Sequence, residues 1–504
     1  MTEFELKFQV DPHQRAAVEA AVSRGRSHVS RLRARYFDTA DGALAAQHLV
    51  IRLRKEGRTW WQTAKAPTDA VLQRHEHNVE LPPLAAREQP QLKLERHGGT
   101  PVGDLITQAL RKAGDDPATA ELVAIYGTDV RRTTREMRTG DALVELAFDH
   151  GDVRAEDHSR PLCELEIELK SGSAHSMLEL ARRWRNRYGL WLDSVSKSER
   201  GQRLAEGHIH GAPVKAVPPA FPDNDPDGPG IVRATVRACL AQILPNASEV
   251  AAGSSDPEHV HQLRVGIRRL RTALREMALF APAIDPTWEP TLASTFHALG
   301  LRRDRDHLEH EVQPRLEAAG APPVDWPDSI AELPDPADVV RGAEFQTVLI
   351  DLIAISLPGD AAGEAPDETP AAAKVPWRKH LRKRLSELYQ EVVRDGRRFE
   401  SLEPAAQHRV RKRLKRLRYL GEFVAPLFDA QEARRFLKEL EPAQDALGRH
   451  NDNAMAIAAY RENAGHDGRS WFAVGWLDAQ QPASATNCRR ALDKVADARP
   501  FWKP

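Results

Sequence analysis

The sequence of 504 residues contains little cysteine and no long hydrophobic run, and each shortage excludes a class of protein. Its three cysteines, Cys163, Cys239 and Cys488, lie far apart without the spacing of a metal site, so we expect ordinary core residues in a reducing compartment. No stretch approaches the roughly 18 apolar residues that a membrane-spanning helix needs. No basic segment followed by an apolar run opens the sequence, so we expect no signal peptide. These absences predict a cytoplasmic protein.

The chain also has almost no net charge, so its overall composition indicates no particular partner. Lysine and arginine total 72 against 73 aspartates and glutamates, which gives a net charge of −1 at pH 7. Charged ligands must therefore be bound by local clusters. Residues 207–230 and 358–376 are rich in proline, which fixes φ and removes a backbone donor, so neither segment is expected to form a long helix or a central strand. We predict an N-terminal domain over 1–206, a linker over 207–230, and a second domain over 231–500 that is split near 358–376.

The first 206 residues contain several segments in which charged and apolar residues alternate. Side chains of a strand point to opposite faces with a period of two. In the first segment Glu3, Glu5 and Lys7 therefore share one face, and the apolar residues between them share the other. The charged positions of the other segments are Arg52 and Arg54, Lys65, Arg132, Glu145 and Asp149, and Glu164, Glu166 and Glu168.

A single strand of this kind is typical of the exposed face of an antiparallel sheet. Five such strands in one domain indicate more, because carboxylates about 7 Å apart on one face repel one another unless cations lie among them. We predict an α+β domain in which a closed antiparallel β-barrel has a charged interior, a tunnel, and an apolar exterior. Helices near 12–24, 102–113 and 173–188 are expected to cover it.

The order of these charged residues resembles that of the CYTH family, the triphosphate tunnel enzymes. Glu3-x-Glu5-x-Lys7 is similar to the ExExK signature of the family, and it stands at the N-terminus, as it does there. The likeness covers about residues 1–206. It continues through Arg52-x-Arg54, Lys65, Arg74-x-Glu76, Arg132, Glu145 with Asp149, the strand with Glu164, Glu166 and Glu168, and Ser196-Lys197. The whole chain resembles bacterial inorganic triphosphatases that carry a second, helical CHAD domain.

The C-terminal half contains an internal repeat. Residues 261–271 match residues 408–418 at an offset of 147, and residues 299–304 match residues 447–452 at an offset of 148. Two motifs at almost one offset indicate a duplication. We therefore predict an all-α domain made of two duplicated helical bundles.

Each copy of the repeat carries a basic stripe along a predicted helix. A solvated face is the usual explanation of such a stripe, but residues 408–418 contain seven lysines and arginines and no acid, which favours a bound polyanion. This half resembles the CHAD domain over about 230–500, and that resemblance implies long-chain inorganic polyphosphate as the ligand. Few aromatic residues that could stack on bases lie beside the stripe, so nucleic acid is the weaker alternative. The expected polyphosphate-binding residues are His261, Arg264, Arg268, Arg271, Arg303, His408, Arg411, Lys412, Lys415 and Arg418.

For the N-terminal domain, the inventory of charges favours metal-dependent hydrolysis of inorganic tripolyphosphate to pyrophosphate and orthophosphate. Fixed cations would bind the phosphates, and carboxylates would hold Mg²⁺ or Mn²⁺. The substrate-binding candidates are Lys7, Arg52, Arg54, Lys65, Arg132, Lys197 and Arg200. The metal candidates are Glu3, Glu5, Asp149, Glu164, Glu166 and Glu168. The catalytic candidates are Glu3, Glu5, Lys7, Lys65, Glu76 and Lys197.

Two alternatives stay open. The tunnel could act on an organic triphosphate, such as thiamine triphosphate or a nucleotide, or the chain could be a polyphosphate-binding protein without activity. Association with polyphosphate granules in the cytoplasm is a further expectation.

Overall fold

The computed structural model describes residues 2–68, 73–83, 88–222, 226–281, 284–327, 333–357 and 376–503. The chain forms two compact units. Unit 1 consists of Met1–Val214, Leu240–His259 and Val340–Ala365, and unit 2 consists of Lys215–Cys239, Val260–Val339 and Pro366–Pro504. Of the first predicted linker, 207–230, residues 207–222 contain no helix or strand, but a helix begins at Gly228, inside the predicted range. Residues 358–375 of the second lie outside the described residues. None of the described helices is both long enough and apolar enough to span a membrane.

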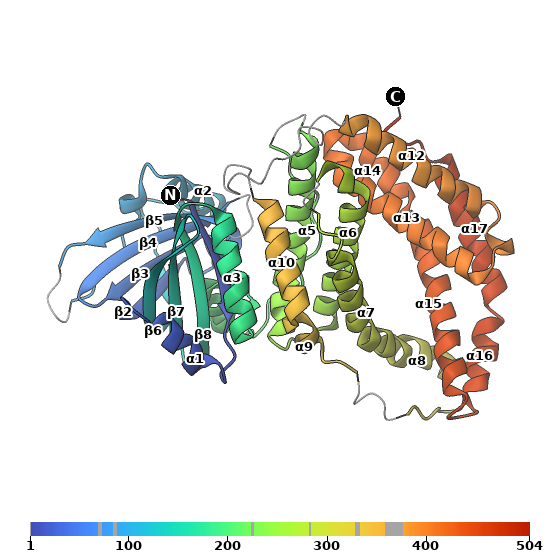
Figure 1. Cartoon of the computed structure of the whole chain (residues 1–504), viewed down its shortest axis with the longest axis horizontal. Helices are drawn as coiled ribbons and strands as arrows, with labels where there is room; N and C mark the ends of the chain where they lie inside the picture. Colours follow the sequence, from blue (N-terminus) through green and yellow to red (C-terminus); the bar gives the residue numbers. More distant parts are fainter. Residues whose placement is uncertain are drawn as a thin grey trace. The chain divides into compact units, whose positions relative to one another are not determined.

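In its described residues, unit 1 is built on an antiparallel sheet of nine strands, drawn in blue and green in Figure 1. The strands are β1 (Thr2–Gln9), β2 (His28–Asp38), β3 (Val50–Glu56), β4 (Thr59–Pro67), β5 (Gln73–Leu81), β6 (Val123–Thr139), β7 (Ala142–Ala155), β8 (His158–Ser171) and β9 (Trp191–Leu192). Their order is β5-β4-β3-β2-β6-β7-β8-β1-β9. The prediction of an antiparallel sheet is thus confirmed.

Near its start β1 also pairs with β5, through Thr2 with His75, Glu3 with Arg74 and Phe4 with Gln73. These three pairs join β5, at one end of the strand order, to the first residues of β1, which lies next to the other end. Closure into a complete barrel stays a prediction.

The alternation in the sequence gives the sheet two different faces. Leu6, Leu146 and Ile167 are fully buried on the outer face. Helix α2 (Pro101–Ala113) covers β4 through a cluster that includes Ile51 and Ile106. Helices α1 (Arg15–Val22) and α3 (Ala174–Tyr188) lie where the sequence predicts them, and α4 (Lys197–Ala205) packs against β6 and β7.

Two further helical segments complete unit 1 from later in the chain. They are the second half of α5 (Gly228–Ala251) and helix α10 (Ala343–Ser356). Helix α10 packs along α3, where a guanidinium nitrogen of Arg182 lies 2.5 Å from a carboxylate oxygen of Asp351. The sequence prediction, which ends the N-terminal domain at residue 206, did not include these segments.

Among the described residues of unit 2, the regular secondary structure is helical, and it begins with the first half of α5. Its helices are α6 (Pro257–Met277), α7 (Trp288–His307), α8 (Gln313–Ala318), α9 (Pro336–Arg341), α12 (Trp377–Gly396), α13 (Pro404–Val424), α14 (Ala430–Glu439), α15 (Glu441–Asn463), α16 (Ser470–Asp478) and α17 (Gln481–Asp497), with the first residues of α6 and the last of α9 belonging to unit 1. Helices α6 and α13 begin and end at the offset of the sequence repeat. Leu263, Ile267 and Leu270 form the buried stripe of α6, beside its basic stripe.

Candidate functional site

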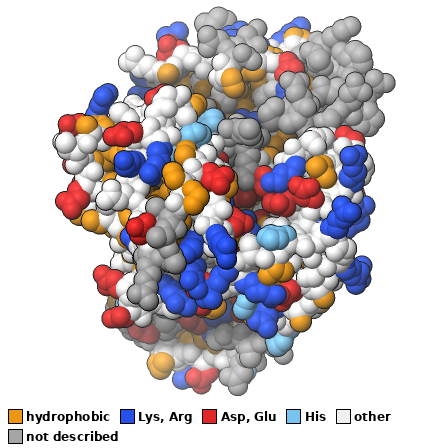
Figure 2. Space-filling view, turned by 90° about the vertical axis from the view of Figure 1, so that its left-hand side faces the viewer, with side chains coloured by type: hydrophobic (Ala, Val, Ile, Leu, Met, Phe, Trp, Pro, Cys, Tyr) orange, Lys and Arg blue, Asp and Glu red, His pale blue; other side chains and the backbone are white. Residues whose placement is uncertain are grey.

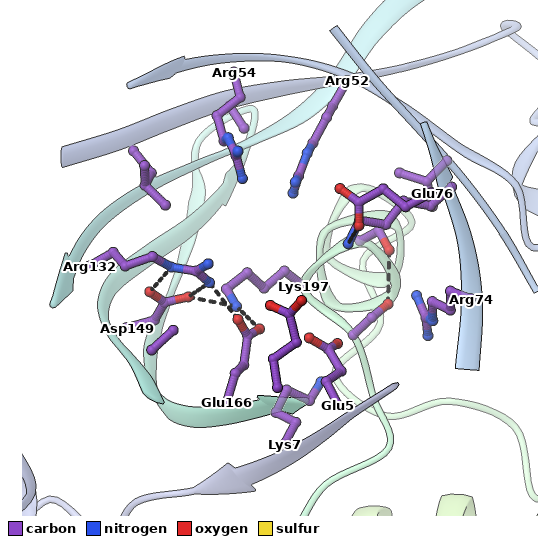
Figure 3. Close-up of a pocket in the computed structure, with 18 of the residues that line it drawn as sticks. Glu5, Lys7, Arg52, Arg54, Arg74, Glu76, Arg132, Asp149, Glu166 and Lys197 are labelled. Carbon is purple, nitrogen blue, oxygen red and sulfur yellow. Dashed lines mark hydrogen bonds and ion pairs between the residues drawn. The ribbon is translucent and has the colours of Figure 1, made fainter. Parts of the chain in front are cut away.

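The inner face of the sheet in unit 1 encloses a cavity of about 690 Å³ (Figure 3). Positively and negatively charged side chains line this cavity. The face of the molecule in Figure 2 also carries lysines, arginines, aspartates and glutamates. The lining cations are Lys7, Arg52, Arg54, Lys65, Arg74, Arg132, Lys170 and Lys197. The lining acids are Glu5, Glu76, Glu145, Asp149, Glu166 and Glu168.

One wall of the cavity is purely basic. Arg52 and Arg54 lie two residues apart on β3, so both point inward, as Figure 3 shows. A guanidinium nitrogen of Arg52 donates to the hydroxyl of Tyr36 at 3.2 Å. The Nε atoms of both arginines are buried and have no hydrogen-bond partner among the described residues. Burial, together with the charge of Arg52, lowers the pKa of Arg54 to about 10. This wall therefore carries positive charge that an anion would neutralise.

The opposite wall carries carboxylates that are held by two cations. The guanidinium of Arg132 donates to both oxygens of Asp149, at 2.7 and 2.6 Å, and to Glu166 at 2.5 Å. The ammonium of Lys197 lies 2.6 Å from Glu166 and 2.8 Å from Asp149, and it also contacts Glu164.

These contacts set the protonation of the wall. Burial raises the pKa of Glu166, but Lys197 and Arg132 lower it well below its usual range. Burial likewise lowers the pKa of Lys197, and the three carboxylates around it raise it well above its usual range. Glu166 and Lys197 are therefore both charged at neutral pH.

Glu5 differs from the other carboxylates of this wall. It projects from β1 toward Glu166, as Figure 3 shows. Burial and the charge of Glu166 raise the pKa of Glu5. Burial is the larger cause of this shift, and a hard divalent cation shared by the two carboxylates would relieve the part that comes from Glu166. Asp149, Glu164 and Glu166 also offer oxygens within 4.8 Å of one another. The ammonium of Lys197 already contacts all three of these carboxylates, so Glu5 and Glu166, which both line the cavity, are the candidates to hold a hard divalent cation.

Three more of the predicted residues of unit 1, Lys65, Lys7 and Glu168, line the cavity. Lys65 lies on the cavity wall, with its ammonium 2.5 Å from Glu76. Lys7 also lines the cavity, although its ammonium is bound to the carbonyl oxygen of Val195. Glu168 lines it as well, at 2.7 Å from Lys170.

Three predicted residues are not among the lining side chains. Glu164 is fully buried beneath the cavity, behind Lys197. Arg200 binds the buried carboxylate of Asp193. Glu3 lies in β1, but its side chain is outside the part of the chain that the structure describes.

Sequence reasoning missed Lys170, Tyr36 and Asp193. Lys170 follows Glu168 at a spacing of two, so the alternation of β8 was a signal that could have found it. Tyr36 continues the inward face of β2, where its neighbours Ala34 and Leu32 are apolar and hide the pattern. Asp193 stands in a short segment without periodicity, and nothing in the sequence marks it.

Unit 2 contains a second cavity, of about 620 Å³, between α6, α7, α13 and α15. Its charged lining is mostly basic. It consists of Arg264, Arg268, Arg271, Arg275, Arg303, Arg411, Lys412, Lys415 and Arg416, with the acids Asp304 and Asp452. His408 lines this cavity too, whereas His261 and Arg418 are not among the lining residues.

The basic groups of this cavity are only partly neutralised. Arg264 lies 3.6 Å from Asp304, and its counterpart in the repeat, Arg411, lies 3.9 Å from Asp452. Buried nitrogens of both guanidinium groups have no hydrogen-bond partner among the described residues. Burial, followed by the charges of Arg268 and Arg411, lowers the pKa of Lys415 to about 6. The cavity is thus suited to a polyanion.

Domain comparisons match the two regions of the chain separately, and one relative matches along almost the whole chain. A CYTH domain matches residues 1–201, and a CHAD domain matches residues 234–461. An inorganic triphosphatase of Haemophilus influenzae is 27% identical over 169 residues, which cover 34% of this chain and 44% of that relative. An uncharacterized protein of Mycobacterium tuberculosis is 25% identical over 513 residues, which cover 94% of this chain and 91% of that relative.

Solved structures resemble the two parts as well. The CHAD domain from the plant Ricinus communis is 28% identical, with a TM-score of 0.43, and the match covers 56% of this chain and 96% of that one. A Hippeastrum protein with a dominant triphosphatase activity is 15% identical, with a TM-score of 0.30, and the match covers 41% of this chain and 97% of that one.

Proposed function

We propose that this chain, a two-domain protein with a CYTH domain followed by a CHAD domain, hydrolyses inorganic tripolyphosphate to pyrophosphate and orthophosphate. The observation that carries the proposal is the cavity of unit 1. It opposes a wall with the guanidinium groups of Arg52 and Arg54, of which Arg54 is partly neutralised by Glu56 at 3.6 Å, to a wall of carboxylates. A tunnel that only bound anions would gain nothing from the carboxylates, because they repel phosphate oxygens.

The residues of the chain divide the chemistry between the walls. Arg52 and Arg54 would bind and orient the phosphate chain, and Lys65 would fix one end of it beside Glu76. Glu5 and Glu166 would hold Mg²⁺ or Mn²⁺, which neutralises charge on the phosphate and lowers the pKa of water. Arg132 and Lys197 keep Glu166 ionised and in place. Phosphoryl transfer needs positioning and charge neutralisation more than a protein nucleophile, and this cavity offers both.

We further propose that the sheet closes around the substrate as a tunnel. The pairing of β1 with β5 supports closure, since it joins the two ends of an otherwise continuous ladder from β5 to β8 and β1. A closed sheet holds inward side chains on a rigid ring, which keeps catalytic geometry constant.

For unit 2 we propose binding of long-chain inorganic polyphosphate without hydrolysis. Among the described residues, nine lysines and arginines but only two acids line its cavity, so the cavity lacks the carboxylate set of unit 1. Buried, unpartnered guanidinium nitrogens of Arg264 and Arg411 support an anionic ligand there.

The deciding experiment is a substrate panel with the full-length chain. Tripolyphosphate, ATP and thiamine triphosphate are compared with Mg²⁺, with Mn²⁺ and with EDTA. We expect tripolyphosphate to be hydrolysed fastest, no turnover in EDTA, and recovery when metal is restored. Preference for ATP or thiamine triphosphate would replace the substrate assignment, and full turnover in EDTA would contradict the metal assignment.

A further inference from the structure

The β9–α4 segment, residues 191–197, sets the position of two cations of the unit 1 cavity. The backbone N–H of Asp193 donates to the carbonyl oxygen of Lys7 at 2.9 Å, and its buried carboxylate lies 3.9 Å from the ammonium of Lys7. The carbonyl oxygen of Val195 accepts a hydrogen bond from the same ammonium. Lys197, at the start of α4, then reaches the carboxylate wall. A shift of this segment would move both Lys7 and Lys197.

The same segment is held from its other side by two side chains from later in the chain. The backbone N–H of Leu192 donates to Oε1 of Gln346 at 2.7 Å. The backbone N–H of Ser194 donates to the hydroxyl of Ser248 at 2.9 Å, and the two serine hydroxyls lie 3.1 Å apart. The guanidinium of Arg341 also lies 4.4 Å from the centre of the Trp191 ring. The segment thus donates from two alternate backbone amides, those of Leu192 and Ser194, to side-chain acceptors from later in the chain.

Both acceptors are themselves fixed. Gln346 is 1% exposed, and its amide nitrogen donates to the carbonyl oxygen of Val340 at 2.8 Å. Ser248 is 6% exposed, and its hydroxyl donates to the carbonyl oxygen of Leu244 at 2.8 Å. A buried side chain with its donor already engaged presents its acceptor in one orientation, so it can define the place of a backbone amide.

We propose that Ser248 and Gln346 are positioning residues for the hydrolytic site, acting through the β9–α4 segment. Both lie in unit 1 but outside residues 1–201, where the CYTH domain matches, so the site of this chain is completed by residues that follow that domain. The inference has a kinetic part, an effect on turnover, which rests on the proposed hydrolysis of tripolyphosphate. Its structural part, that these two acceptors hold Lys7 and Lys197, is independent of the substrate.

The test uses the full-length chain and the variants Ser248→Ala, Gln346→Met and their combination. We measure kcat and KM for tripolyphosphate with Mg²⁺, hydrogen exchange of the amides in residues 190–197, and the melting temperature. We expect faster exchange of the Leu192 and Ser194 amides and about a tenfold loss of kcat/KM in the double variant, with a rise in KM because a phosphate-binding cation is displaced. Ser248→Thr keeps a hydroxyl at this position and should restore most of the loss of Ser248→Ala.

Thr347→Ala is the matched control. Thr347 is half-buried on the same helix as Gln346, and its hydroxyl donates to the carbonyl oxygen of Ala343 on that helix. We expect wild-type kinetics from this variant. An equal loss in Thr347→Ala, or unchanged kcat and KM in the double variant, would overturn the inference.

Failure of the proposed function would be visible separately. A wild-type chain that hydrolyses no triphosphate would contradict the function, and calorimetric binding of tripolyphosphate would then replace kinetics. Weaker binding by the double variant than by the wild type would support the inference, and equal affinity would overturn it.

Discussion

The two cavities of this protein are similar in volume and both are basic, but they differ in their acids. The cavity of unit 1 combines eight lysines and arginines with six carboxylates, whereas that of unit 2 combines nine with two. The difference changes the charge state of their lysines. Carboxylates outweigh burial and raise the pKa of Lys197, while burial and neighbouring arginines lower the pKa of Lys415 to about 6. A cavity that binds an anion needs cations alone, and one that also holds a metal must carry carboxylates and the cations that keep them ionised.

The largest effect on this difference between the two cavities is expected from removing one carboxylate from unit 1. Glu166→Gln keeps the shape of the side chain but removes the charge that would hold the metal. We expect kcat/KM for tripolyphosphate to fall by a factor on the order of 10²–10³, as when a preorganised electrostatic group is removed. Affinity for polyphosphate in unit 2 should not change. Glu121→Gln, at an exposed position, is the control, and near-normal turnover by Glu166→Gln would contradict the metal assignment.

Unit 2 is tested by removing the two arginines that the repeat relates. Arg264→Ala combined with Arg411→Ala removes two buried guanidinium groups with unpartnered nitrogens. A hydrogen bond to a charged group contributes about 1.5–3 kcal/mol, so the double variant should bind long-chain polyphosphate about 100-fold more weakly. Wild-type affinity should fall steeply with added salt. Titration calorimetry measures both.

Hydrolysis of tripolyphosphate by that double variant should be unchanged, because every proposed catalytic group lies in unit 1. Equal affinity of the wild type for double-stranded DNA at the same ionic strength would show a generic cationic surface rather than a polyphosphate site.

Variants of two adjacent residues of β3 allow the effects of charge and of packing in unit 1 to be measured separately. Arg52→Ala removes an inward cation and should raise KM for tripolyphosphate about tenfold, with little change in stability. Ile51 is fully buried on the other face. Ile51→Ala should therefore lower the free energy of unfolding by about 2–5 kcal/mol and leave KM unchanged. Steady-state kinetics and urea unfolding distinguish the two. Stable but inactive Ile51→Ala, together with active but unstable Arg52→Ala, would reverse the assignment of the faces.

The smallest expected effect is a pH dependence in unit 2. Lys415 has a pKa of about 6 and faces Arg268, Arg411, Arg303 and Asp452. It is therefore mostly neutral at pH 7, and a bound polyanion, which raises its pKa, must bind together with part of a proton. Affinity for polyphosphate should rise a few-fold as pH falls from 8 toward 6, and level off below 6.

Calorimetry in two buffers of different ionisation enthalpy measures this proton uptake. Lys415→Arg, which stays charged throughout that range, should abolish it. Burial also lowers the pKa of His408, which bonds to Asn451, so uptake that persists in Lys415→Arg would assign the proton to His408.

Much of unit 1 could be predicted from local patterns. The alternation of β3 and β7 placed Arg52, Glu145 and Asp149 on one face, because side-chain direction in a strand depends only on parity. The offset of the repeat predicted helices α6 and α13, since a duplicated sequence repeats its own amphipathic pattern. The alternation along a strand could not show how deeply each side chain is buried. Glu164 shares the face of Glu166 but is sealed behind Lys197, and Arg200 turns to Asp193 instead of the cavity.

The sequence by itself determined which strand residues share a face and which helices carry the basic stripes, because both depend on the few residues around each position. Only the tertiary structure decided the partners. Glu166 meets Arg132 and Lys197 from 34 and 31 residues away, and Ser194 and Leu192 meet Ser248 and Gln346 from 54 and 154 residues away. Such contacts depend on how the whole sheet curls and on which helices return to it, and no local periodicity encodes that packing.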